Sequence, residues 1–201
     1  MALMTTLHSV STAEAIAQLL QGAVGVLPTD TVYGLVACAS NQAAVARLYE
    51  LKKRDHKPGT IVAANVDQLV ALGIKKRYLN AVADMWPNPL SIVLPVGPEL
   101  AYLDQEVGSL AVRIPKDETL QKVLAQTGPL VTSSANQPGA QTAATLAAAY
   151  DYFGDSIDFY VDGGDLSGKP ASTVIRVVDD AIEVLRQGAL ELDENGYPQS
   201  V

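Results

Sequence analysis

The sequence is poor in the residues on which several common kinds of protein depend. Its 201 residues include one cysteine, Cys38, and two histidines, His8 and His56. A single cysteine excludes an internal disulfide and a cysteine-rich zinc cluster, and the two histidines are not spaced as metal ligands. Cys38 lies in the apolar stretch LVACAS. We therefore expect a buried thiol that takes no part in chemistry.

Long apolar runs and the best-known catalytic motifs are also missing. No apolar stretch is long enough to span a bilayer, and residues 1–10 lack the basic start and apolar stretch of a secretory signal. We expect a cytoplasmic protein that does not contact a membrane. The chain has no G-x-x-x-x-G-K-[ST] loop, no G-x-G-x-x-G fingerprint and no G-x-S-x-G elbow. Any catalysis must therefore use a different arrangement of side chains.

Basic residues are outnumbered by acidic ones, yet four cations gather in one short stretch. The formal net charge is −8 and the isoelectric point is near 4.6, which argues against nucleic-acid binding as the main task. Residues 51–59, LKKRDHKPG, nevertheless contain the cations Lys52, Lys53, Arg54 and Lys57. Such a local cluster on an acidic chain predicts a site for a small anionic ligand. We expect His56, in the same loop, to be solvated or to contact phosphate rather than to act as a base.

The spacing of apolar residues, together with Gly and Pro at the ends of segments, predicts alternating helices and strands. Ser11, Asn41, Asp117 and Thr142 are each expected to cap a helix. The predicted helices cover residues 11–20, 41–54, 66–73, 118–128 and 143–154, and the predicted strands cover residues 23–29, 32–39, 60–64, 88–96, 109–115, 129–136, 159–164, 172–178 and 182–188.

This order of elements predicts an α/β-layered fold in a single domain, with a twisted mixed sheet flanked by helices. We expect the domain to span residues 1–201, with a core of about 11–188. Residues 189–201 are expected to form a polar, peripheral tail.

Polar side chains gather at the ends of several predicted strands, where α/β sheets commonly hold ligands. The segments are PTDTVYG, VTSSANQPG and KPASTVIRV, and EVLRQG adds Arg186. Within SLAVRIP, Arg113 should point to the face opposite Leu110 and Val112. Its guanidinium could clamp a carboxylate, or it could form a buried structural ion pair. Together these residues describe a pocket rich in donors for phosphate and carboxylate, with no evident nucleophile.

In this order, the motifs resemble the YrdC family of threonylcarbamoyl-AMP synthases. The matching segments are GVLPTDTVYGL, LYELKKRDHKPGTIVAAN, WPNPLSIVLP, SLAVRIP, LVTSSAN and ASTVIRV, which cover about residues 11–188. The resemblance implies a twisted mixed sheet with a central concave cavity. It also implies that L-threonine, bicarbonate and ATP, with Mg²⁺ on the ATP phosphates, give threonylcarbamoyl-AMP and pyrophosphate. A separate transferase complex would then pass the threonylcarbamoyl group to tRNA.

The resemblance also implies roles for particular residues. Lys52 and Arg54 would be the catalytic K-x-R pair, and Lys57 would join Arg54 on the ATP phosphates. Arg113 would clamp the threonine carboxylate. The other implied threonine contacts are Thr31, Ser134 and Ser172, and the other implied ATP contacts are Ser109, Thr132, Ser134, Asn136, Thr142 and Arg186.

The chain departs from the family pattern in its cationic loop. Asp55 stands where many relatives have Pro, the loop is one residue shorter, and Gly59 replaces a frequent Leu. We expect the short form of the family, without the long C-terminal extension of some relatives. Three alternatives follow: a module that binds double-stranded RNA or tRNA without turnover, a carbamoyl-adenylate synthase with a different amine or acid, and a regulatory paralogue that binds nucleotide without turnover.

Overall fold

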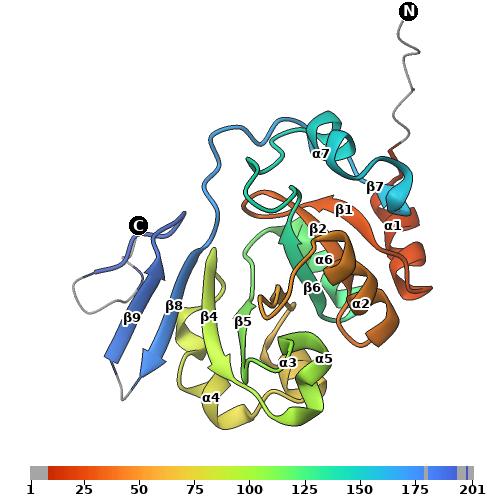
Figure 1. Ribbon diagram of the computed structural model, residues 1–201. Coiled ribbons are helices and arrows are strands. Elements are labelled where there is room, and N and C mark those ends of the chain that lie inside the picture. Colours follow the sequence, from red (N-terminus) through yellow and green to blue (C-terminus); the bar gives the residue numbers. More distant parts are fainter. Residues whose placement is uncertain (1–8, 179–180, 194–197, 199–201) are drawn as a thin grey trace, which may run out of the picture.

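The computed structural model describes residues 9–178, 181–193 and 198 (Figure 1). Residues 1–8, which carry most of the segment tested for a secretory signal, lie outside this description. The helices are α1 Thr12–Leu20, α2 Gln42–Leu51, α3 Val66–Leu72, α4 Lys76–Asn80, α5 Ala101–Asp104, α6 Glu118–Thr127 and α7 Leu146–Phe153, with short 3₁₀ turns at Ala83–Met85, Pro98–Leu100 and Gly154–Ser156. In the described part of the chain, no helix is long and apolar enough to cross a membrane.

One mixed sheet runs through the molecule (Figure 1). Its strands are β1 Gly25–Pro28, β2 Tyr33–Cys38, β3 Thr60–Val62, β4 Leu90–Pro95, β5 Ser109–Arg113, β6 Leu130–Ser134, β7 Phe159–Tyr160, β8 Thr173–Val178 and β9 Ala181–Arg186. The spatial order is β7-β1-β2-β6-β3-β5-β4-β8-β9. The pairs β1/β7, β3/β5 and β4/β8 are parallel, and the others are antiparallel. The predicted α/β fold with a mixed sheet is confirmed.

Side-chain caps set most of the helix starts. Ser11 forms a capping box with Glu14, and Asn41 and Asp117 accept backbone N–H groups as expected. The predicted cap Thr142 is wrong, because Thr145 accepts the N–H of Ala148 and α7 begins three residues later. The backbone of residues 143 and 144 is already bonded to residues 135 and 166, so the helix cannot start there.

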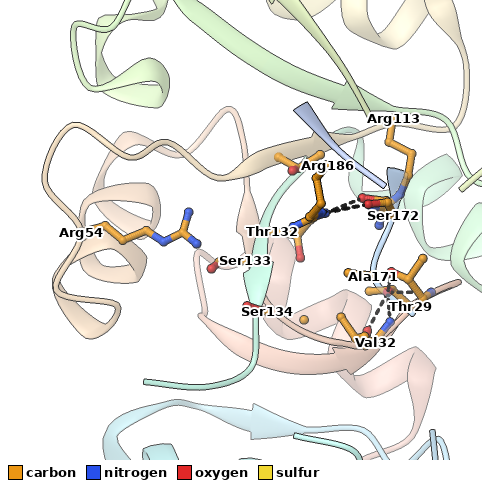
Figure 2. A pocket seen from close by; sticks show the side chains of 13 residues that line it. Thr29, Val32, Arg54, Arg113, Thr132, Ser133, Ser134, Ala171, Ser172 and Arg186 are labelled. Atoms are coloured by element: carbon orange, nitrogen blue, oxygen red, sulfur yellow. Dashed lines mark hydrogen bonds between the residues drawn. The ribbon is translucent and has the colours of Figure 1, made fainter. Parts of the chain in front are cut away.

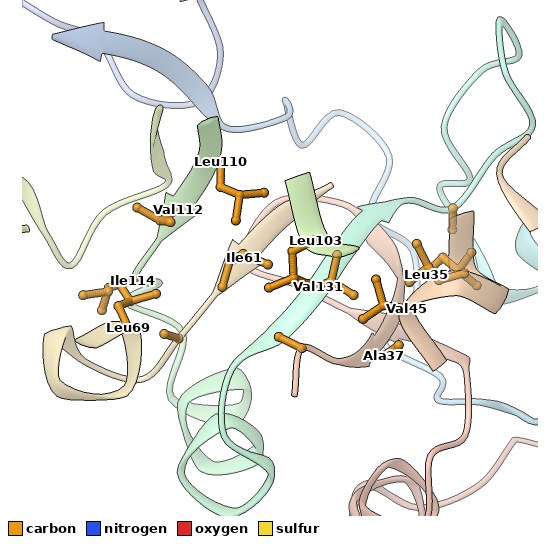
Figure 3. Close-up of a cluster of buried hydrophobic side chains, with 14 of the residues drawn as sticks. Leu35, Ala37, Val45, Ile61, Leu69, Leu103, Leu110, Val112, Ile114 and Val131 are labelled. Atoms are coloured by element: carbon orange, nitrogen blue, oxygen red, sulfur yellow. The ribbon is translucent and has the colours of Figure 1, made fainter. Parts of the chain in front are cut away.

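The strands bury side chains on both faces of the sheet because helices cover both faces. On β2, Val36 and Cys38 join a smaller cluster with α1 and α6, while Leu35 and Ala37 join the main cluster with α2. Figure 3 shows part of the main cluster, in which side chains of β2, β3, β5 and β6 meet those of α2 and α3. The expected burial of Cys38 is confirmed, and burial raises the pKa of its thiol.

The described residues that follow β9 are tied to the sheet. Thr173 Oγ1 donates to the carbonyl of Leu190 at 2.7 Å and accepts the N–H groups of Gly188 and Leu190. The half-buried side chains of Leu190 and Leu192 pack against the main cluster. These contacts hold β9, and with it Arg186, against the rest of the sheet.

Candidate active site

A polar pocket, called here the inner pocket, opens where the ends of β1, β2, β3 and β6 approach β8 and β9 (Figure 2). Its volume is about 110 Å³. Three arginines reach it, Arg54 from one side and Arg113 and Arg186 from the other. The remaining lining residues are Thr29, Thr31, Val32, Gly34, Thr60, Thr132, Ser133, Ser134, Ala171 and Ser172. Among the described residues no carboxylate lines this pocket, so its charge is positive.

Arg113 is the most deeply buried cation of the inner pocket. Only 5% of its side chain is exposed, and Nη2 lies 3.0 Å from Oδ1 of Asp30, whose side chain is 9% exposed. Burial lowers the pKa of Arg113 and raises the pKa of Asp30, and each charge partly offsets the shift of the other. Within the described residues, Nε of Arg113 and both oxygens of Asp30 lack a partner in hydrogen-bond geometry. Arg113 and Asp30 thus form a buried ion pair whose hydrogen-bonding capacity is only partly used.

Arg186, the last residue of β9, is held by Ser172, which directly precedes β8. Its Nη2 donates to the carbonyl oxygen of Ser172 at 2.8 Å and to the hydroxyl at 3.1 Å (Figure 2). The Ser172 hydroxyl also lies 3.0 Å from that of Ser91, and Arg113 Nη1 lies 3.5 Å from the Ser91 hydroxyl. These hydroxyls link the two arginines, and the proximity of Arg186 further lowers the pKa of Arg113. Asp30 pairs with Arg113, whereas Arg186 forms no ion pair with a carboxylate of the described residues, so one of the two positive charges is unmatched.

The cationic loop, defined as residues 52–59, borders a second and larger pocket of about 440 Å³, called here the loop pocket. Arg54 and Ser134 line both pockets, so the two are contiguous. Arg54 Nη1 donates to the carbonyls of Lys57 and Pro58, each at 3.1 Å. The other residues that line the loop pocket are Lys52, Lys53, Asp55, Lys57, Asn136, Pro138 and Gly139.

Lys52 follows the last turn of α2 and is almost completely buried, at 2% exposure. Its Nζ donates to the carbonyl of Ser134 at 2.7 Å and also contacts the carbonyl of Asn136. Burial, aided by the positive charge of Arg54, lowers the pKa of Lys52 to about 8. The lysine is still protonated at pH 7, and it joins the cationic loop to the S-x-N segment.

The structure brings together most of the residues predicted for the site. The predicted residues on the inner pocket are Thr31, Arg54, Arg113, Thr132, Ser134, Ser172 and Arg186. Those on the loop pocket are Lys52, Arg54, Lys57, Ser134 and Asn136. Ser109, the first residue of β5, and Thr142, which precedes α7, are not among the lining residues of either pocket. Their proposed contacts with the nucleotide stay predictions.

Several lining residues were given no role from the sequence. Thr60 opens β3 opposite Thr132 of β6, and Ser133 has a buried hydroxyl without a partner in the described residues. The hydroxyl of Thr60 at a strand end is the signal that could have found it, whereas Ser133 lies in VTSSANQPG, which the sequence already marks as a source of phosphate and carboxylate donors. The His56 side chain is largely exposed, and its Nδ1 lies 3.0 Å from the carbonyl oxygen of Gln105. Its expected contact with phosphate stays a prediction.

Comparison with protein families gives one match over most of the chain. The model of the Sua5/YciO/YrdC family, described as "Telomere recombination", matches residues 17–188. The threonylcarbamoyl-AMP synthase of Pseudoalteromonas translucida is 36% identical over 157 residues, which are 75% of this chain and 84% of the relative. The synthase of the same name from Pseudomonas aeruginosa is 35% identical over 160 residues, 78% of this chain and 86% of the relative.

Solved structures give the same fold. P. abyssi Sua5 complexed with L-threonine has a TM-score of 0.81 and 30% identity. That match covers 91% of this chain, which spans only 55% of the longer Sua5 chain. E. coli YciO has a TM-score of 0.78 and 92% coverage of both chains, and at 22% identity it supports the fold alone.

Proposed function

Because the chain belongs to the Sua5/YciO/YrdC family, we propose that it is a threonylcarbamoyl-AMP synthase, the name given to its P. translucida and P. aeruginosa relatives. In this proposal it is a nucleotidyltransferase that condenses L-threonine, bicarbonate and ATP and releases pyrophosphate. The observation that carries the proposal is the inner pocket, with three arginines, seven side-chain hydroxyls and no lining carboxylate among the described residues. Such a lining suits a carboxylate beside a phosphate chain.

Threonine would occupy the end of the inner pocket near Arg113. One positive charge is unmatched there, and the threonine carboxylate would neutralise it. The planar guanidinium of Arg113 can meet a carboxylate with two parallel hydrogen bonds. Hydroxyls of Thr31 and Ser172 line the same pocket and can bond the polar groups of the amino acid. The L-threonine in P. abyssi Sua5 supports a threonine site in this fold.

ATP would extend from the inner pocket into the loop pocket. Arg54 lines both pockets, so it can contact phosphates beside the threonine and beyond it. Lys52 and Lys57 add positive charge to the loop pocket, and Ser134 and Asn136 add polar contacts. The described residues contain no group of three or more His, Cys, Asp or Glu that could hold a metal ion. Mg²⁺ would therefore arrive on the phosphates of ATP, as it does in many ATP sites.

The reaction asks the protein for positioning and charge stabilisation. The threonine amine and bicarbonate combine to a carbamate with loss of water. A carbamate oxygen then attacks the α-phosphorus of ATP, and the bond to pyrophosphate breaks. Bound close together, the reactants can gain about 7 to 11 kcal/mol in favourable cases. Arg54, Lys52 and Lys57 would stabilise the negative charge that develops on the phosphoryl oxygens.

The product would serve tRNA modification. In this proposal, a separate transferase complex receives threonylcarbamoyl-AMP in the cytoplasm and moves its acyl group to the N6 atom of an adenosine in tRNA. The protein would therefore meet tRNA only indirectly.

Pyrophosphate release tests the proposed function. Purified protein with ATP and Mg²⁺ should release pyrophosphate only when both L-threonine and bicarbonate are present, and mass spectrometry should find threonylcarbamoyl-AMP. L-Serine and L-valine serve as controls for the amino acid. Release that requires bicarbonate but not threonine would mean that the enzyme uses a different amine as substrate. No release under any condition would refute the proposed synthase activity.

A further inference from the structure

The cationic loop is held from outside its two pockets by a turn that no motif marks. This turn, residues 103–108, comprises the last two residues of α5 and the connection to β5, and it lies about 50 residues further along the chain. Gln105 Oε1 accepts the N–H of Lys57 at 2.7 Å, and Gln105 Nε2 donates to the carbonyl of Arg54 at 3.1 Å. The main-chain carbonyl of Gln105 also lies 3.0 Å from Nδ1 of His56. One residue thus contacts three residues of the loop.

From these contacts we propose that Gln105 is a positioning residue that holds the cationic loop in the form that binds the ATP phosphates. The inference rests on the proposed function for the identity of the ligand. Gln105 lines neither pocket, so it would act only through the loop.

The chemistry of the Gln105 side chain matches the loop backbone. Across the segment from Arg54 to Lys57, the loop presents one carbonyl acceptor and one N–H donor to Gln105. A carboxamide carries an acceptor and a donor on the same planar group, so it can satisfy both. Glutamate keeps the acceptor and loses the donor, and methionine of similar length offers neither.

Both partners adopt backbone conformations that need outside support. Gln105 and Glu106 have positive φ values of 52° and 64°, and Lys53 and His56 in the loop have 48° and 49°. Non-glycine residues hold such conformations only where surrounding contacts enforce them. In the turn, the buried carboxylate of Asp104 accepts the N–H groups of Glu106 and Gly108 at 2.9 and 2.6 Å. These two hydrogen bonds hold the turn that contacts the loop.

The loop itself has few other anchors near its centre. Tyr49 Oη accepts the N–H of Gly59 and donates to the carbonyl of Leu103, which fixes the end of the loop. Lys52 fixes its start. Between these ends, Gln105 supplies the contacts to Arg54, His56 and Lys57 from another part of the chain. A loop already held in its binding form loses less conformational entropy when a ligand binds.

The test compares Gln105→Met with the control Gln126→Met, which alters an exposed glutamine whose side chain donates to the carbonyl of Lys122 in its own helix. Limited trypsin digestion of the ligand-free protein reports loop order, because trypsin can cut after Lys53 or Arg54. Calorimetry measures the binding of Mg²⁺-ATP and of L-threonine. We expect Gln105→Met to be cut about tenfold faster and to bind ATP about tenfold more weakly, about 1.4 kcal/mol. Threonine affinity should stay within about twofold, and the control should match the wild type.

Gln105→Glu provides a second variant if Gln105→Met does not fold. It keeps the acceptor for Lys57 and loses the donor to Arg54, so its cleavage rate and ATP affinity should fall between those of wild type and Gln105→Met. Unchanged cleavage in both variants, or faster cleavage with unchanged ATP affinity, would overturn the positioning role. A wild-type protein that binds neither ATP nor threonine would refute the proposed function instead, and the digestion would still decide whether Gln105 holds the loop.

Discussion

Arg113 combines deep burial with incomplete pairing. The side chain is 5% exposed, Asp30 supplies its ion pair, and Nε has no hydrogen-bond partner within the described residues. The sequence left two readings of Arg113 open, a carboxylate clamp and a structural ion pair. The structure shows the ion pair, and the charge left unmatched by Asp30 keeps the clamp as our proposal. The two roles are compatible, since Asp30 fixes the guanidinium that would meet the ligand.

Arg113→Lys should weaken the binding of threonine much more than the binding of ATP. An ammonium group keeps the charge but cannot form two parallel hydrogen bonds with a carboxylate. We expect the KM for threonine to rise about 10- to 100-fold, a loss of about 1.4 to 2.8 kcal/mol, with the KM for ATP within about twofold. Steady-state kinetics with each substrate varied in turn measures this. The control is Arg176→Lys, an exposed arginine that pairs with Glu183 on the β8–β9 hairpin. Equal increases for both substrates would contradict the assignment.

At the scale of elements, the pairing of β2 with β6 shapes the floor of the inner pocket. Gly34 of β2 lies opposite Ser134 of β6. A Cβ atom on Gly34 would come within 2.5 Å of Thr132 Oγ1 and 3.2 Å of Thr29 Cγ2. Both neighbours line the pocket. Only glycine at position 34 therefore lets the side chains of Thr132 and Thr29 lie this close to β2.

Gly34→Ala should therefore displace Thr132 and lower both stability and activity. Forcing a methyl group into a packed site costs about 1 to 3 kcal/mol. Chemical denaturation should show a loss in this range, and kcat/KM for both substrates should fall. Gly97→Ala is the matched control, because the three atoms nearest its added methyl all belong to the flexible carboxylate of Glu99. A Gly34→Ala enzyme with wild-type stability and kinetics would show that Thr132 has room to move.

Much of this arrangement could be predicted from the sequence, because local signals determine it. Three of the four expected caps hold, and alternation on β5 correctly puts Arg113 opposite Leu110 and Val112. The helices α4 and α5 were missed because each spans five residues or fewer and has no side-chain cap. Gln105 was missed for another reason. Its left-handed conformation is carried by a residue type that does not signal a turn, and its partners are about 50 residues away.

At the scale of the whole molecule, the charge distribution bears on the alternative of RNA binding. The net charge is −8, and all four cations of the loop line the loop pocket, namely Lys52, Lys53, Arg54 and Lys57. Lys52 is buried, so it cannot reach a duplex backbone. This loop then leaves three cations to neutralise phosphates of a large nucleic acid, on a chain whose net charge repels it.

We expect tRNA binding to be weak and strongly dependent on salt. With about four phosphate contacts, affinity should fall about 100-fold between 50 and 200 mM salt. Filter binding of tRNA over this range measures the dependence, with duplex DNA of similar length as the control for sequence-independent attraction. Tight binding of tRNA that persists at 200 mM salt would revive the RNA-binding alternative.

The position of β6 has a consequence for how the chain is made. This strand lies between β2 and β3, yet it follows both in the sequence, after α3 to α6. While the ribosome is still adding those helices, the facing edges of β2 and β3 have no strand to pair with, and such edges attract other chains. The central sheet can close only after residue 134 has emerged. The strand that brings Thr132 to the pocket thus sets how long the nascent protein depends on protection from aggregation.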